Sequence, residues 1–138
     1  MTDSRPIIVI VDDEDAVRKS LMRNLEPLNL EIVSFASGVE ALSWLRDHEA
    51  WVIIADYAMP GLDGTEFLRQ AKALRPKARR LMLSGEGDLD VAMTAMEGDV
   101  IERYVTKPWH PDKLRKTISC LAKICGCEKC SHDEERPL

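Results

Sequence analysis

Apolar residues along the chain follow two alternating patterns. Five short segments are almost continuously apolar, and between them lie longer segments in which apolar side chains recur at helical spacing. The first pattern is typical of buried strands and the second of amphipathic helices. The predicted strands are 7–11, 31–35, 51–55, 80–83 and 104–106. The predicted helices are 16–28, 37–48, 65–74, 88–99 and one that runs from Pro111 to about residue 124.

Regular alternation of strands and helices indicates an α/β protein, with one parallel sheet covered by helices on both faces. Right-handed crossovers place the loop after each strand at the same edge of such a sheet. Ligands bind at this carboxyl edge, near the point where the strand order reverses. Functional side chains are therefore expected directly after the predicted strands.

Charged and hydroxyl side chains stand at four of the five strand ends. Asp12 and Asp13 follow the first strand, Asp56 follows the third, Ser84 ends the fourth and Lys107 follows the fifth. Clustered carboxylates are costly unless a cation or a reaction requires them. Their convergence at one edge predicts a chemical site.

The residue types at this site indicate its chemistry. Asp12, Asp13 and Asp56 offer the hard oxygen ligands that suit Mg²⁺. A carboxylate can also accept a phosphoryl group as an acyl phosphate, a transfer that needs a positioned cation to stabilise its charge. Lys107 is the natural cation, and the Ser84 hydroxyl can hydrogen-bond a phosphoryl oxygen. The sequence therefore predicts a magnesium-dependent phosphoryl acceptor.

Composition narrows the possible partners and locations. A chain of 138 residues suits one domain. A net charge of −5 argues against direct binding of nucleic acid or of an anionic membrane. No apolar run is long enough to cross a bilayer, and the first residues lack signal-peptide character. We expect a cytoplasmic location.

The five site residues are those of a known family. With them, the chain resembles the response-regulator receiver domains of two-component signalling, the CheY-like superfamily, over about residues 6 to 124. Asp12 and Asp13 match the acidic pair, Asp56 the phosphorylated aspartate, Ser84 the hydroxyl position, and Lys107 the lysine that precedes a proline. The turn at 59–64 is similar to the loop that follows the acceptor, and Tyr104 matches the aromatic residue whose rotamer follows phosphorylation.

The resemblance implies a fold and a mechanism. The fold is a flavodoxin-like (βα)5 sheet, doubly wound, with strand order 2-1-3-4-5. A sensor histidine kinase or phosphotransfer protein donates a phosphoryl group to Asp56, with Mg²⁺ held by the acidic pair, Asp56 and the backbone carbonyl of Ala58. Ser84 and Lys107 then move toward the phosphoryl oxygens and Tyr104 turns inward. The face formed by the fourth helix, fifth strand and fifth helix changes, and a downstream target protein or a second copy of the chain binds it.

Such a domain is a signalling switch rather than a turnover enzyme, although it can promote its own phosphotransfer and dephosphorylation. Three alternatives stay open. A magnesium phosphatase with an aspartyl nucleophile needs an acid two residues after it, where this chain has Ala58. A flavodoxin needs a phosphate-binding loop after the first strand, where Asp12, Asp13 and Glu14 would repel a flavin phosphate. A degenerate receiver would act only as a docking adaptor. Asp12 and Asp13 could also serve simply as helix caps.

The end of the chain carries separate chemistry. We expect the receiver domain to occupy residues 1–124, followed by a polar segment at 125–138. Cys125, Cys127, Cys130 and His132 have a spacing that suits Zn²⁺ or another soft metal. The alternatives are free thiols, with Cys120 included, or a redox-sensing role.

Two further side chains carry expectations. Trp109 follows Lys107 and Pro108, which would place it at the surface near the edge of the site, where a docking role is open. The run from Lys107 to Trp109 is similar to receivers fused to cyclic-di-GMP phosphodiesterase or transcription-activator modules. Asp63 is expected to be a turn-former.

Overall fold

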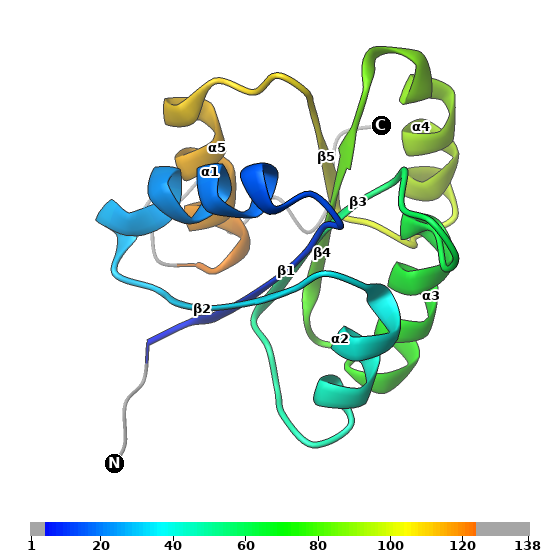
Figure 1. Ribbon diagram of the computed structural model, residues 1–138, viewed down its shortest axis with the longest axis horizontal. Helices are drawn as coiled ribbons and strands as arrows, with labels where there is room; N and C mark the ends of the chain where they lie inside the picture. Colours follow the sequence, from blue (N-terminus) through cyan, green and yellow to red (C-terminus); the bar gives the residue numbers. More distant parts are fainter. Residues whose placement is uncertain (1–4, 124–138) are drawn as a thin grey trace.

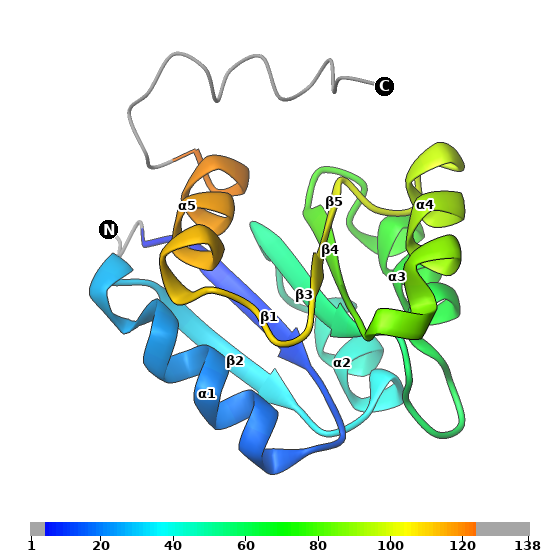
Figure 2. The same cartoon turned by 90° about the horizontal axis from the view of Figure 1, so that it is seen from above.

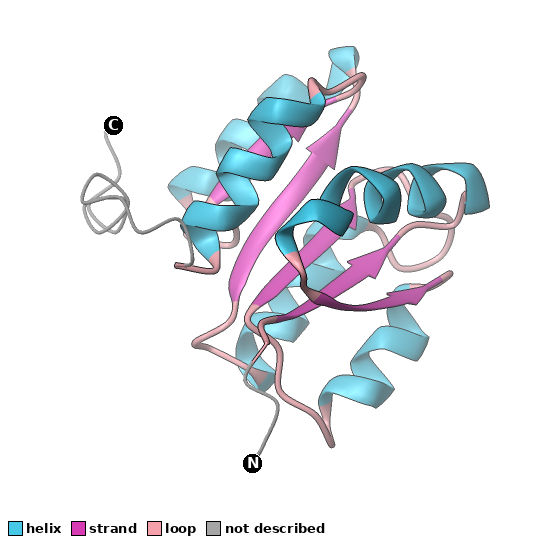
Figure 3. Ribbon diagram, turned by 90° about the vertical axis from the view of Figure 1, so that its left-hand side faces the viewer, coloured by secondary structure: helices cyan, strands magenta, loops and turns pink. Residues whose placement is uncertain are grey.

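A five-stranded parallel sheet forms the centre of the molecule. The computed structural model describes residues 5–123, and the strands lie in the order β2-β1-β3-β4-β5. All strands point the same way (Figure 3). The predicted doubly wound, flavodoxin-like sheet is therefore confirmed. The strands are β1 (Ile7–Val11), β2 (Glu31–Phe35), β3 (Val52–Asp56), β4 (Arg79–Ser84) and β5 (Arg103–Thr106).

Helices cover both faces of this sheet. α1 and α5 lie on one face, and α2, α3 and α4 lie on the other (Figures 1 and 2). None of the helices among residues 5–123 has both the length and the apolar character required to cross a membrane. The helices are α1 (Asp15–Leu25), α2 (Gly38–Leu45), α3 (Gly64–Leu74), α4 (Leu89–Glu97) and α5 (Pro111–Leu121), with short 3₁₀ turns η1 (Glu26–Leu28) and η2 (Glu86–Asp88).

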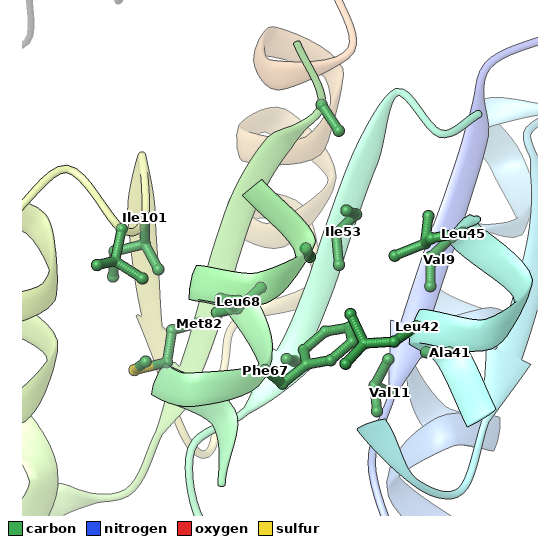
Figure 4. Packing of buried hydrophobic residues seen from close by; sticks show 14 of the residues in the cluster. Val9, Val11, Ala41, Leu42, Leu45, Ile53, Phe67, Leu68, Met82 and Ile101 are labelled. Atoms are coloured by element: carbon green, nitrogen blue, oxygen red, sulfur yellow. The ribbon is translucent and has the colours of Figure 1, made fainter. Parts of the chain in front are cut away.

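The core consists of two apolar clusters, one on each side of the sheet. Along β1, Val9 packs on the side of α2 and α3, whereas Ile8 packs on the side of α1 and α5. Phe67 of α3 is fully buried in the first cluster, where Figure 4 shows it between α2 and the sheet. β3 is buried along its whole length. Burial on both faces explains why the strands are continuous apolar runs.

The first helix is shorter than predicted. α1 ends at Leu25, and the following residues form the 3₁₀ turn η1, which contains Pro27. Proline lacks a backbone N–H and cannot continue the hydrogen-bond ladder of an α-helix. Asn29 then adopts the left-handed conformation, with φ of 57°, which suits asparagine. The predicted end at residue 28 is correct for the helical segment but not for the α-helix.

The cysteine and histidine residues predicted to bind a soft metal lie outside the described residues. That prediction, which concerns Cys125, Cys127, Cys130 and His132, therefore stays a prediction, as does the boundary of the receiver domain at residue 124. Cys120 belongs to α5, where it is buried and disulfide-bonded. The expectation of a free thiol is therefore wrong for this residue.

Candidate functional site

The register of the strands brings the predicted site residues to one edge of the sheet. The residue before Asp12 pairs with the residue before Asp56, and Ser84 pairs with the residue before Lys107. Side chains from β1, β3, β4 and β5 are thus neighbours, although they lie far apart in the sequence. The convergence follows directly from parallel pairing.

Backbone hydrogen bonds continue the ladder just past the strand ends. The Asp12 N–H donates to the carbonyl of Phe35 at 3.1 Å, and the Lys107 N–H donates to the carbonyl of Ser84 at 2.8 Å. The Tyr57 N–H, directly after Asp56, donates to the carbonyl of Leu83 at 2.9 Å. The functional side chains therefore project from backbone that the sheet holds rigidly.

Three carboxylates and one ammonium group form the centre of the site. Asp12, Asp13 and Asp56 each place a carboxylate oxygen within 4.8 Å of the others. The Lys107 Nζ lies 3.0 Å from Asp56 Oδ1 and 3.9 Å from Asp12 Oδ2. Asp12 is completely buried and Asp56 is buried, whereas Asp13 is exposed. One lysine therefore faces three acidic groups.

Burial makes the carboxylates of Asp12 and Asp56 hard to ionise. Desolvation raises the pKa of Asp12 from 3.8 to about 6, and the nearby Asp56 carboxylate adds to the rise, while the Glu14 amide and Lys107 oppose it. Desolvation also raises the pKa of Asp56, against the hydrogen bond and charge of Lys107. The single lysine does not offset the loss of water around the two groups, so the site favours a further cation.

Two buried polar atoms of the site have no hydrogen-bond partner among the described residues. They are Asp12 Oδ2 and Ser84 Oγ. The other oxygen of Asp12 accepts the Glu14 N–H at 2.8 Å, but Glu14 is itself the residue that caps α1, without a side-chain cap hydrogen bond, so this local bond accounts for only half of the Asp12 carboxylate. Buried polar atoms are normally paired. An acceptor oxygen and a hydroxyl left over in this way fit a metal ion and a phosphoryl oxygen, and three carboxylates are a suitable oxygen set for Mg²⁺.

The two remaining predicted site residues lie at the margins. Ala58 is exposed in the loop after β3, two residues beyond Asp56. Tyr104 is half-buried in β5 and packs against the cluster on the side of α4. It also lines a groove between β5 and α5, together with Trp109 and Lys113. The switching role of Tyr104 stays a prediction.

Sequence reasoning missed several residues that hold the site in place. A Cβ on Gly64 would lie 2.3 Å from the carbonyl oxygen of Asp56, so only glycine allows α3 to approach the acceptor strand. Asp63, expected to be a turn-former, instead caps α3 by accepting the Glu66 N–H at 2.9 Å. Arg18 donates to the carbonyl of Asp12 at 2.6 Å. In the sequence, these positioning roles were signalled only by an aspartate and a glycine, Asp63 and Gly64, just before the predicted helix.

Comparison with known proteins agrees with this geometry. A model of the response regulator receiver domain family matches residues 8–119, and the chain therefore belongs to this family of phosphoacceptor domains. Phosphorylation and an acidic Mg²⁺ pocket are typical of the family. A solved CheY-like receiver domain protein from Methanospirillum hungatei is 27% identical, with a TM-score of 0.79 over 97% of this chain and 100% of that one.

Curated relatives are longer than this chain. The C4-dicarboxylate transport transcriptional regulatory protein DctD of Rhizobium meliloti is 33% identical over 109 residues, which are 79% of this chain and 24% of that protein. The cyclic di-GMP phosphodiesterase response regulator RpfG of Xanthomonas campestris is 34% identical over 122 residues, which are 85% of this chain and 32% of that protein. The chain spans about a third or less of the length of these relatives.

The clearance at Gly64 gives a first prediction. Gly64→Ala should destabilise the fold by about 1–3 kcal/mol, because its Cβ would overlap backbone atoms that cannot rotate away. Gly87→Ala is the matched control, since a Cβ there meets no atom within 4 Å, and it should change stability by less than about 0.5 kcal/mol. Urea unfolding measures both. Equal stability of the two variants would show that the close approach of α3 is not a constraint.

Asp12 gives a second prediction, on pH. Its pKa of about 6 in the fold lies above the ordinary 3.8, so the folded state binds this proton more tightly than the unfolded chain does. Without divalent cations, the resulting stability is fully present below pH 3.8 and is lost as the pH rises to about 6, by up to about 3 kcal/mol.

Urea unfolding in a chelator from pH 4 to 8 tests this, with Asp12→Asn as the variant that lacks the titration. The stability of wild type relative to Asp12→Asn should fall over this range. The matched control is Asp47→Asn, which makes the same chemical change at an exposed position outside the carboxylate cluster. A constant difference between wild type and Asp12→Asn would contradict the raised pKa.

Proposed function

We propose that this chain is a magnesium-dependent phosphoacceptor switch that receives its phosphoryl group on Asp56 from a histidine kinase or phosphotransfer protein. The observation that carries the proposal is the arrangement around Asp56 Oδ1. This oxygen lies 3.0 Å from Lys107 Nζ, within a carboxylate cluster whose neighbours, Asp12 Oδ2 and Ser84 Oγ, are buried and have no hydrogen-bond partner among the described residues.

Four groups of the chain would hold the metal ion. They are the carboxylates of Asp12, Asp13 and Asp56, with the backbone carbonyl of Ala58. When bound, Mg²⁺ would supply the positive charge that three clustered carboxylates and an incoming phosphoryl group require. This need is independent of the family likeness, because it follows from the raised pKa values of Asp12 and Asp56 and from the Asp12 oxygen that accepts no hydrogen bond from any described residue.

The side chains divide the work of the transfer. The ionised Asp56 carboxylate attacks the phosphorus atom, forming a new P–O bond as the bond between phosphorus and the donor's imidazole nitrogen breaks. Lys107 is already in contact with Asp56, so its ammonium group stays beside the acyl phosphate and donates to one phosphoryl oxygen. Ser84 donates its otherwise unpaired hydroxyl to another.

The output of the switch would be read on α4, β5 and α5. New contacts of Ser84 and Lys107 with the phosphoryl group bias a two-state equilibrium, and Tyr104, three residues before Lys107 on β5, changes its packing with it. Large apolar side chains on α4 support a docking role, because Leu89 is 40% exposed and Met93 is 47% exposed. A downstream target protein or a second copy of the chain would cover them.

A docking adaptor that has lost its chemistry is the second function considered in the sequence. Such an adaptor would not require a lysine, Lys107, in contact with the Asp56 carboxylate. It would not require the buried Ser84 hydroxyl, which has no hydrogen-bond partner among the described residues. The intact geometry therefore favours a working acceptor.

Phosphorylation by acetyl phosphate provides the direct test. Intact mass should show the gain of one phosphoryl group by wild type only when Mg²⁺ is present. Asp56→Asn, which preserves size but removes the nucleophile, should gain none, whereas Asp47→Asn should behave as wild type. The proposal fails if Asp56→Asn is modified to the same extent as wild type, or if modification of wild type does not depend on Mg²⁺.

A further inference from the structure

Trp109 is anchored to α1 by a hydrogen bond. Its indole N–H donates to Asn24 Oδ1 at 2.7 Å, across 85 positions of sequence. The side chain is half-buried and packs against the apolar cluster beneath α1 and α5. The indole therefore makes a tertiary contact at the predicted place near the edge of the site, and its docking role stays a prediction. Trp109 lies two residues after Lys107, so this hydrogen bond holds the chain close to the lysine of the site.

The acceptor of this hydrogen bond is itself fixed. Asn24 lies in the last turn of α1, where backbone carbonyls lack partners within the helix. Arg115 of α5 donates to the Asn24 carbonyl at 3.0 Å, and α1 and α5 lie side by side (Figures 1 and 2). Asn24 thus joins three elements: the end of α1, the helix α5 and the loop that leads into α5.

Lys107 lies between two anchors as a result. On one side, its backbone N–H is bound to Ser84 of β4 at 2.8 Å. On the other side, the chain is held at Trp109 by Asn24 at 2.7 Å. A long lysine side chain has considerable rotamer freedom, and a backbone fixed at both points limits the positions that its ammonium group can reach. The 3.0 Å contact of this group with Asp56 starts from that fixed backbone.

We propose that Trp109 and Asn24 are positioning residues for Lys107, and that their hydrogen bond couples the acceptor site to α1 and α5. The inference rests on the proposed function. It adds a second connection out of the site, on the sheet face opposite α4. When Lys107 shifts toward a phosphoryl group, the displacement passes through the indole to α1 as well as along β5 to Tyr104.

Beryllofluoride, which mimics the phosphoryl group, separates the role of Lys107 from metal binding. Asn24→Ala should weaken beryllofluoride binding at saturating Mg²⁺ by about fivefold, the size of one net hydrogen bond. Binding of Mg²⁺ alone should be unchanged, because carboxylates hold the ion. Trp109→Phe keeps the packed ring and loses the N–H, and it should match Asn24→Ala. Titration calorimetry measures both ligands.

Two further variants make the test specific. Asn24→Asp retains an acceptor oxygen and should recover most of the wild-type affinity for beryllofluoride. The double variant Asn24→Ala with Trp109→Phe should lose no more than either single variant, because both remove the same bond. The inference is overturned if Asn24→Ala binds beryllofluoride as wild type does, if Asn24→Asp fails to recover, or if Mg²⁺ affinity falls in parallel.

Failure of the proposed function gives a different result. In that case wild type itself would show no Mg²⁺-dependent binding of beryllofluoride, or Asp56→Asn would bind it equally well. Urea unfolding of each variant confirms that affinities are compared among folded proteins. A wild type that binds, with an Asn24→Ala variant that binds equally, overturns the positioning role alone.

Discussion

The electrostatic imbalance at the carboxyl edge of the sheet is the constraint on which the rest of the site depends. Three carboxylates share a space in which their oxygens lie within 4.8 Å, opposite a single lysine. A fold can hold such a cluster only where the backbone beneath it is rigid. Parallel pairing of β1, β3, β4 and β5, buried on both faces, supplies that rigidity and leaves the strand ends open to a ligand. In the proposed function, a bound cation and a phosphoryl group would act on the structure by relieving this electrostatic imbalance.

Residues outside the carboxylate cluster position it and would transmit a change at the cluster to the rest of the fold. Gly64 lets α3 begin directly against the acceptor strand, and Arg18 fixes the backbone at Asp12. Lys107 is the point from which two connections leave the site. One runs along β5 to Tyr104 and the face of α4. The other passes through Trp109 and Asn24 to α1 and α5. Under the proposed coupling, a movement of the lysine would therefore have consequences on both faces of the sheet.

The sequence predicted the parts of this account that depend on local pattern. Continuous apolar runs identified the strands, and parallel topology then brought Asp12, Asp56 and Lys107 together without any knowledge of distances. Contacts between distant side chains were beyond its reach. The bond between Trp109 and Asn24 depends on how α1 and α5 rotate about their axes, which periodicity does not specify. The close approach of α3 to the acceptor strand is possible because Gly64 has no Cβ. The early end of α1 depends on the competition between an α-helix and a 3₁₀ turn at Pro27.

The central claim is that one carboxylate of the cluster, Asp56, accepts the phosphoryl group while its neighbours serve the metal. Reduction of the acyl phosphate with borohydride, followed by peptide mass mapping, locates the accepting residue directly. After treatment with acetyl phosphate and Mg²⁺, the reduced residue should be found at position 56 alone, and omission of Mg²⁺ should abolish it. Reduced residues at position 12 or 13, or the same yield at position 56 without Mg²⁺, would contradict the account.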